Sequence, residues 1–180
     1  DSYAQADREA AAVPAGSDGA IYLPYLSGER TPHMDPDAKG TFFGLTLRHG
    51  RGHFLRAVME GVAYSLRDCL TLMQELGADA PEVIASGGGA ASGVWLQIQA
   101  DILQKPVRAC TVKEQACLGA CLLAAVGTGL LPSLTEGRRR FVTMEETSWE
   151  PIPAHRAVYD ERYGTFQELY RRTKDLMKAK

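Results

Sequence analysis

One stretch of sequence decides the fold: Val83-Ile84-Ala85-Ser86-Gly87-Gly88-Gly89-Ala90-Ala91-Ser92-Gly93-Val94-Trp95, followed by the run 96–103. A short apolar run, three glycines and an amphipathic run at helical spacing predict a strand, a tight turn and a helix. Glycine permits positive φ and lets another molecule approach bare main-chain amides. The first N–H groups of a helix are unpaired and carry partial positive charge. The corner therefore suits a nucleotide or another anion.

A glycine-rich turn can also be no more than a connection between a strand and a helix. Short motifs taken alone have chance matches, so the pattern is a hypothesis about function. The corner by itself leaves ligand binding and a purely structural turn as alternatives. The flanking sequence has to decide between them.

The composition is that of an ordinary globular protein, with 45% hydrophobic and 23% charged residues among 180. This length corresponds to about one domain with a sizeable core. A formal net charge of −2 predicts no basic surface for nucleic acid. The run Arg138-Arg139-Arg140 is interpreted as a solvated turn, because glutamates flank it. No apolar run reaches the ~18 residues of a membrane span, so we expect neither nucleic acid nor membrane as a partner.

The N-terminus and the cysteines indicate the context and the cellular compartment of the chain. The chain starts at Asp1, without a methionine or a signal peptide, so we expect it to begin inside a longer protein. The four cysteines form no Cys-x-x-Cys pair. Cys117 and Cys121 lie four residues apart among Leu and Ala, and we expect them to be buried thiols in a reducing, cytoplasmic compartment. We expect no metal site among them.

Periodicity predicts strands that alternate with helices after a hairpin-like start. This order is typical of an α/β fold with a mixed sheet flanked by helices. Phe43, Leu45 and Leu47 are expected on one face of the second strand, and Glu60 away from the apolar face of the long helix. The predicted strands are 20–26, 40–47, a run from Val83, 106–110 and 141–142, and the predicted helices are 1–12, 53–76, 92–103, 114–127 and 154–177.

A loop of thirteen residues, 27–39, separates the first two predicted strands. It exceeds the usual connection of about 4–6 residues, and long ordered loops tend to be functional. Glu29, Arg30 and His33 are its candidate contacts to a cleft, together with Asp35. The alternative is that these side chains pair with neighbours while prolines stiffen the loop.

Two segments carry a family resemblance. Residues 40–60, from Gly40 through Gly44-Leu45 and His53-Phe54 to Ala57-Val58-Met59-Glu60, resemble the second signature of the FGGY carbohydrate kinases. The stretch Gly87-Gly88-Gly89-Ala90, with the residues after it, is similar to the adenosine motif of that family. Glu114 with Leu118-Gly119-Ala120 resembles the helix that closes the same pocket. The motif residues after the glycines are Ser92, Trp95, Gln97, Ala100 and Asp101.

The resemblance implies an actin-like ATPase (ribonuclease H-like) domain, residues 1–180 being the C-terminal half of a two-domain kinase. It implies ATP and Mg²⁺ as cofactors, with the Mg²⁺ bound together with the nucleotide. It places the general-base Asp in a Gly-rich segment upstream of Ala20 that this chain lacks, so no catalytic residue and no metal ligand is assigned here. The implied nucleotide-binding residues are Gly87, Gly88, Gly89, Ala90, Ser92, Leu118 and Gly119.

Within the family, the loop from Tyr22 to His33 is most similar to the xylulokinase branch. This resemblance implies phosphorylation of D-xylulose to D-xylulose 5-phosphate in a cytoplasmic enzyme, and an inactive isolated chain. The sequence leaves the oligomeric state open, with a homodimer as one option. The alternatives are another FGGY kinase acting on a different pentulose, a polyol or a signal molecule, or a nucleotide-binding actin-like module without sugar chemistry. Residues upstream of Asp1 would discriminate between them.

Overall fold

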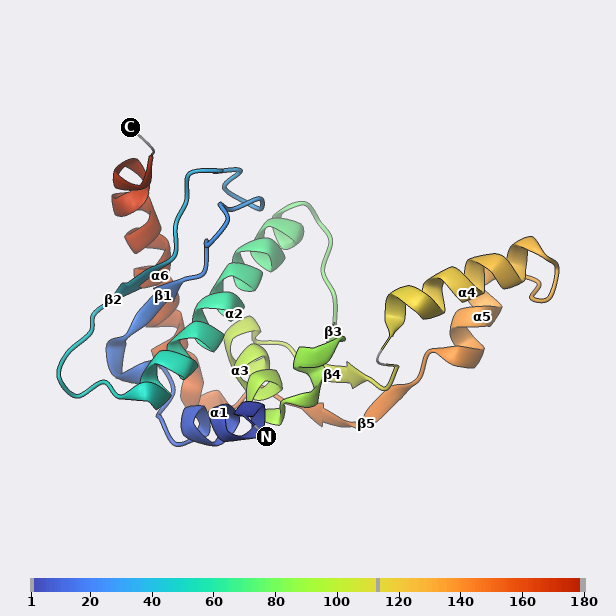
Figure 1. Cartoon of the computed structure of the whole chain (residues 1–180), viewed down its shortest axis with the longest axis horizontal. Coiled ribbons are helices and arrows are strands. Elements are labelled where there is room, and N and C mark those ends of the chain that lie inside the picture. The colour runs from blue at the N-terminus through green and yellow to red at the C-terminus, as the bar shows by residue number, and fades with distance from the viewer. Residues whose placement is uncertain (1, 113, 179–180) are drawn as a thin grey trace.

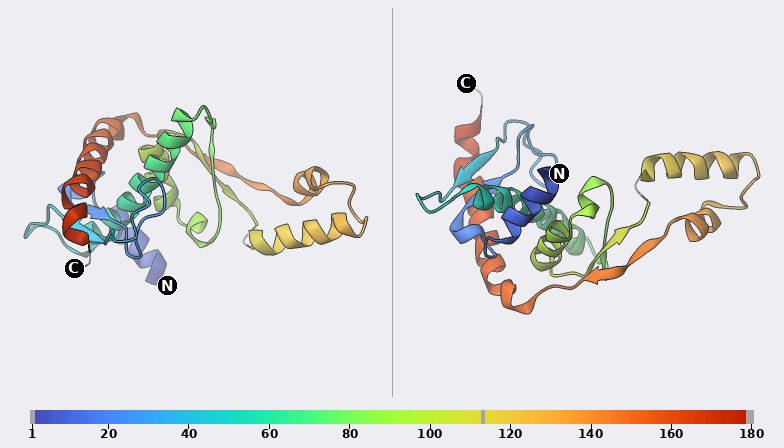
Figure 2. Two further views of the ribbon diagram at one scale, coloured as in Figure 1. Left: turned by 90° about the horizontal axis from the view of Figure 1, so that it is seen from above. Right: turned by 60° about the horizontal axis from the view of Figure 1, so that its bottom comes forward.

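The computed structural model describes residues 2–112 and 114–178 and shows a helical body that carries a projecting arm (Figure 1). The arm consists of α4 and α5, which the strands β4 and β5 connect to the body, and it extends away from the body in the further views as well (Figure 2). The helices are α1 Ser2–Ala11, α2 Arg51–Glu75, α3 Gly93–Leu103, α4 Gln115–Gly127, α5 Leu134–Phe141 and α6 Arg156–Met177, with short 3-10 helices η1 Ser17–Gly19, η2 Gly88–Ala91 and η3 Pro153–His155.

The main core lies where β1 meets the inner faces of α2, α3 and α6. Gly61 makes the approach of α2 to β1 possible, because a Cβ at this position would lie 2.1 Å from the Tyr22 carbonyl oxygen. The apolar stripes of the three helices interlock around this contact. Buried members of this cluster include Ile21, Leu23, Tyr64, Ile98, Ile102 and Phe166.

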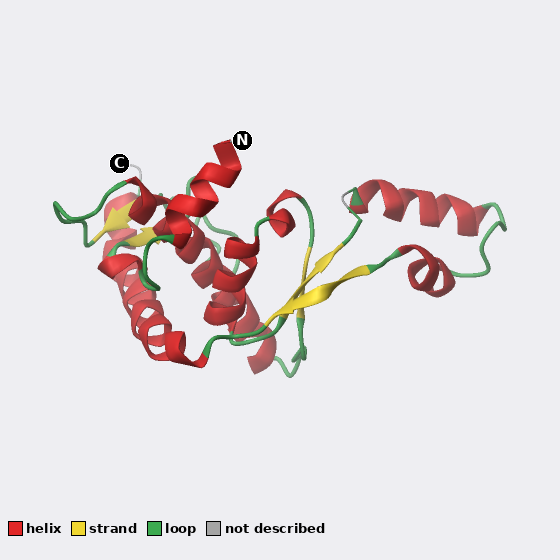
Figure 3. Cartoon of the chain, turned by 90° about the horizontal axis from the view of Figure 1, so that it is seen from below, coloured by secondary structure: helices red, strands yellow, loops and turns green. Residues whose placement is uncertain are grey.

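Two separate sheets stand where the sequence predicted one. The strands are β1 Ile21–Leu23, β2 Thr41–Phe43, β3 Val83–Ala85, β4 Val107–Cys110 and β5 Met144–Trp149. β1 and β2 form an antiparallel pair, whereas β4 pairs in parallel with β3 and antiparallel with β5. The three-stranded sheet is therefore mixed, as expected, and Figure 3 shows its strands leading from the body toward the arm.

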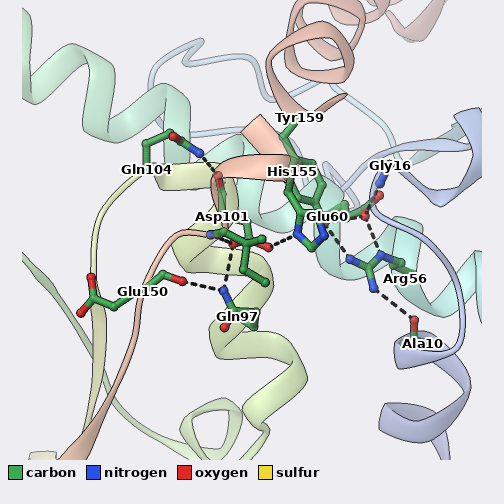
Figure 4. A network of polar contacts seen from close by, with 11 residues as sticks. Ala10, Gly16, Arg56, Glu60, Gln97, Asp101, Gln104, Glu150, His155 and Tyr159 are labelled. Carbon is green, nitrogen blue, oxygen red and sulfur yellow. Dashed lines mark hydrogen bonds and ion pairs between the residues drawn. The ribbon is translucent and has the colours of Figure 1, made fainter. Parts of the chain in front are cut away.

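The prediction for Glu60 was wrong, since this side chain is only 1% exposed. Its carboxylate accepts hydrogen bonds from Arg56 Nε at 2.8 Å, from Ser17 Oγ at 2.8 Å and from the Tyr159 hydroxyl at 3.0 Å (Figure 4). These partners belong to α2, η1 and α6. Helical periodicity could not predict that Glu60 is buried, because a charged residue enters a core only when partners from other elements neutralise it.

The arm also departs from expectation. Cys117 and Cys121 are exposed, because α4 packs on α5 and not on the body, and no described residue of α4 is buried. The arginine run 138–140 forms the last turn of α5, where basic side chains suit the negative helix end, and not a turn between elements. The strand predicted at 141–142 occurs instead as β5, because Phe141 ends α5.

The second strand is shorter than predicted, and its apolar face is not covered. Phe43 is 51% exposed, Leu45 43% and Leu47 fully exposed. β2 ends at Phe43, and the residues after it lie in a turn that leads to α2. Within the described residues, no helix combines the length and the apolar character that crossing a membrane requires.

Candidate functional site

The glycine-rich corner follows β3, as the sequence predicted. Gly87 has φ of 79°, in the region that favours glycine, and it turns the chain into η2. Ser92 ends η2 and is the N-cap of α3, since its hydroxyl accepts a hydrogen bond from the Trp95 N–H at 3.1 Å. The residues 87–92 thus form a strand–turn–helix corner with two consecutive helix starts.

A cavity of about 410 Å³ lies beside this corner. Its side formed by the corner is almost free of side chains, because it consists of glycine and alanine positions. The opposite side comes from the end of β4, from the start of α4 and from β5. Its lining residues are Gly87, Gly88, Ala90, Ala91, Ala109, Cys110, Thr111, Val112, Glu114 and Glu145.

Gly88 and Gly89 differ in what surrounds them. A Cβ on Gly88 would meet no atom within 4 Å, so this position faces open space beside the cavity. A Cβ on Gly89 would lie 3.1 Å from the Trp95 indole nitrogen, so this glycine faces α3. Gly88 is therefore the position at which a side chain would enter the cavity without disturbing the protein around it.

The wall opposite the corner is held by β-pairing. β3 and β4 run in parallel with Val83 opposite Val107, so the chain leaves both strands at the same edge of the sheet. In open α/β sheets this carboxyl edge is where ligands bind. Beyond β4, the Thr111 N–H donates to the Thr143 carbonyl at 3.0 Å, which fixes the wall to the segment that enters β5.

Leu118 and Gly119 do not line this cavity. Leu118 lies in a hollow between α4 and α5, beside Leu122 and Phe141. Gly119 borders another hollow of the arm, beside Leu123 and Val142. The structure thus brings the glycine corner and Glu114 together at one cavity. The role of Leu118 and Gly119 in nucleotide binding stays a prediction.

Gln97 and Asp101, from the same sequence motif, face away from the cavity and anchor α3. Asp101 is 1% exposed and accepts hydrogen bonds from Gln97 Nε2 at 2.9 Å and from the Ile152 N–H at 2.8 Å. His155 Nδ1 lies 2.7 Å from the other carboxylate oxygen (Figure 4). These contacts connect α3 with the segment before α6.

The candidate cleft loop is closed on itself. The Glu29 carboxylate accepts hydrogen bonds from the N–H groups of Thr31 at 2.6 Å and His33 at 2.7 Å. The His33 ring stacks on Tyr170 at 4.0 Å between ring centroids. The Tyr170 hydroxyl also donates to Asp35 at 2.8 Å and holds the pKa of this carboxyl below its usual value of 3.8.

Arg30 is the exposed member of that loop. The loop lies against α2 through a hydrogen bond from Cys69 Sγ to the Thr31 carbonyl, and against α6 through Tyr170. None of its residues lines the cavity at the glycine corner. A cleft function for Glu29, Arg30 and His33 stays a prediction.

The described lining of the cavity contains several groups that can form hydrogen bonds with a ligand. Its lining offers main-chain groups, the Thr111 hydroxyl, the Cys110 thiol and two carboxylates. Within residues 2–112 and 114–178, no group of three His, Cys, Asp or Glu side chains is arranged to hold a metal ion. Ligand binding at this site therefore stays a prediction, and the described residues offer no metal centre.

Thr111, Val112 and Glu145 line the cavity but were not predicted from the sequence. Thr111 and Val112 could have been predicted, because residues that follow a strand parallel to β3 lie at the same edge of the sheet. Glu145 had no local signal, because β5 was predicted at 141–142 and its antiparallel pairing with β4 depends on the whole arm.

The family model, the sequence relatives and the solved structure that match this chain are all carbohydrate kinases. Residues 1–128 match the model of the FGGY family of carbohydrate kinases, C-terminal domain. The chain is 37% identical over 179 residues to the xylulose kinase of Bacillus subtilis, which covers 99% of this chain and 36% of that relative. The gluconokinase of the same organism is 41% identical over 134 residues, which covers 74% of this chain and 26% of that relative.

A solved structure gives the same result in three dimensions. The crystal structure of xylulose kinase from Rhodospirillum rubrum superimposes with a TM-score of 0.83 at 38% identity. The match covers 97% of this chain and 35% of that structure. The chain therefore spans about a third of the length of these relatives.

Proposed function

Because the chain belongs to the FGGY family of carbohydrate kinases, we propose that it supplies the nucleotide-binding side of an ATP-dependent sugar kinase. The observation that carries the proposal is the cavity of about 410 Å³ beside the glycine corner. A side-chain-free wall next to a helix start is the environment that nucleotides favour. The nucleoside would lie against Gly88, with Ala90 and Ala91 beside it.

D-Xylulose is the proposed sugar, with D-xylulose 5-phosphate as the product. The support is the similarity to xylulose kinases over nearly the whole chain, in sequence and in structure. Gluconate is the second candidate, because a gluconokinase is 41% identical over 134 residues. A coupled assay of the full-length kinase against D-xylulose, other ketoses and gluconate separates the two.

Phosphoryl transfer depends on positioning and charge stabilisation more than on covalent help from the protein. In this proposal the chain binds and orients the nucleoside and excludes water from the Gly88 side, whereas the base that accepts the sugar proton lies in another part of the kinase. The described residues do not form a Mg²⁺ site of their own. Mg²⁺ would be bound with the nucleotide, where it would supply charge stabilisation for the phosphates.

The Gly88→Val substitution tests the placement of the nucleotide. Valine would project into space where no atom lies within 4 Å, so it should exclude ATP sterically and leave the fold intact. We expect at least a tenfold loss of ATP affinity by calorimetry, with an unchanged circular dichroism spectrum. Gly164→Val in α6, also without a neighbour within 4 Å, is the matched control and should bind ATP like the wild type.

Unchanged ATP affinity in a folded Gly88→Val protein would contradict the placement. The proposal also requires that the isolated 180 residues bind ATP without phosphorylating a sugar, since they lack the proposed base. Turnover of D-xylulose by this chain alone would show that the base lies within it.

A further inference from the structure

The helix α4 has the composition of a buried helix but lies at the surface of the arm. Its sequence, Gln115–Gly127, contains no charged residue, and its apolar residues are spread over all sides of the helix. A helix that is apolar all round is normally enclosed by other parts of a protein. None of the described residues of α4 is buried, and the Leu123 side chain is 62% exposed. The described elements therefore cover only part of what this helix can bury.

The contact between α4 and α5 is narrow and is bordered by two hollows. A Cβ on Gly137 would lie 2.7 Å from Leu122 Cδ2, so the two helices meet closely at this point. Leu122 lines both hollows, one of about 390 Å³ beside Phe141 and one of about 460 Å³ beside Leu134. Both are lined mainly by apolar side chains, so they suit apolar side chains that project from a partner surface.

One guanidinium group borders each hollow without a counter-charge. Arg140 lines the first hollow and Arg138 lines the second. Neither forms an ion pair with a described residue, whereas Arg139 between them lies 3.0 Å from the Glu136 carboxylate. A surface that complements the two hollows therefore carries carboxylates next to its apolar side chains.

We propose that the arm is a docking surface for the part of the kinase polypeptide that lies outside these 180 residues, and that this part presents apolar side chains flanked by carboxylates. The relatives that match nearly the whole chain are about three times as long, so most of each relative lies outside the match. A large apolar surface left exposed favours aggregation, so the cover has to be present at all times. A segment of the same polypeptide meets this condition, whereas a second copy binds only at sufficient concentration.

Amide hydrogen exchange of the full-length kinase and of the 180-residue chain tests this docking. We expect peptides of α4 to exchange about tenfold or more slowly in the full-length protein, because the docked surface shields the helix. Peptides of α3, most of which is buried in this chain, should exchange at similar rates in both proteins. Equal exchange of α4 in the two proteins would overturn the proposal. Protection that is lost on dilution would also overturn it, because a second copy would then be the cover.

Leu123→Asp separates docking from the stability of the arm itself. The side chain is already largely exposed in this chain, so α4 of the 180-residue variant should exchange within about twofold of the wild type. In the full-length kinase the carboxylate would enter an apolar interface, and α4 should lose its added protection. Leu123→Met keeps an apolar side chain and should keep the protection. A folded full-length Leu123→Asp protein with full protection of α4 would contradict docking on this face.

Arginine variants test the stated chemistry of the partner. The double variant Arg138→Glu/Arg140→Glu should speed exchange of α4 in the full-length kinase by about fivefold or more, because like charges would then meet. Arg138→Lys/Arg140→Lys keeps both charges and should behave like the wild type. If charge reversal leaves the exchange of α4 unchanged, the partner surface is not acidic and this part of the proposal fails. Neither variant touches the glycine corner, so both results are independent of the proposed nucleotide site.

Discussion

Glu60 and Arg56 form a buried ion pair that connects three helices of the body. Arg56 also donates to the Tyr159 hydroxyl at 2.8 Å and to the Ala10 carbonyl at 3.3 Å (Figure 4). Burial raises the pKa of Glu60, whereas Arg56 and Ser17 act in the opposite direction. The acidic residue that ends the segment resembling the second family signature therefore has a structural role in this chain.

Removal of one partner from this pair should be costly. Glu60→Ala leaves the Arg56 guanidinium buried without a counter-charge, so we expect a loss of about 3–5 kcal/mol in the free energy of unfolding. Urea denaturation measures this loss, and Glu75→Ala at the exposed end of α2 should change stability by less than about 0.5 kcal/mol.

The double variant Arg56→Met/Glu60→Leu provides a second check. An apolar pair of similar volume removes the uncompensated charge, so most of the lost stability should return. If the double variant is as unstable as Glu60→Ala, the uncompensated charge of Arg56 is not the cause of the lost stability.

At the scale of the element, α3 determines where the glycine corner lies. Ser92 is the N-cap at its start, and Asp101 near its end accepts hydrogen bonds from the segment before α6. Ser133 has the same role in α5, where its hydroxyl accepts from the Glu136 N–H at 3.2 Å. The two caps have equal chemistry, but one belongs to the body and the other to the arm.

Substitution of the two caps should therefore have different effects. Ser92→Ala and Ser133→Ala each remove a cap worth about 1 kcal/mol to its helix. We expect Ser92→Ala to lower the denaturation midpoint of the body and to weaken ATP binding, since the corner loses a support. Ser133→Ala should leave both unchanged and speed amide exchange in α5 alone. Equal loss of ATP affinity in the two variants would contradict this division.

At the scale of the whole molecule, the body and the arm differ in how they are stabilised. α4 consists mostly of apolar residues on all sides, which is typical of a buried helix, yet no described residue of it is buried. α2, α3 and α6 share the main core instead. The arm depends on its two helices and on the pairing of β4 with β5.

Amide hydrogen exchange of the 180-residue chain should report this difference. Local stability follows buried contacts, so we expect α4 and α5 to exchange at least tenfold faster than α2 and α3. Mass spectrometry of peptic peptides measures the rates. Equal protection of α4 and α3 would mean that the arm is covered in solution, for example by a second copy of the chain.

The sequence alone determined the order of helices and strands apart from α5, and the corner at 83–103, because these depend on local periodicity and on glycine. The tertiary structure alone decided the burial of Glu60, the exposure of Cys117 and the entry of Glu145 into the cavity. Each of these depends on partners far away in the chain. Burial and charge pairing are properties of such contacts, which no local pattern contains.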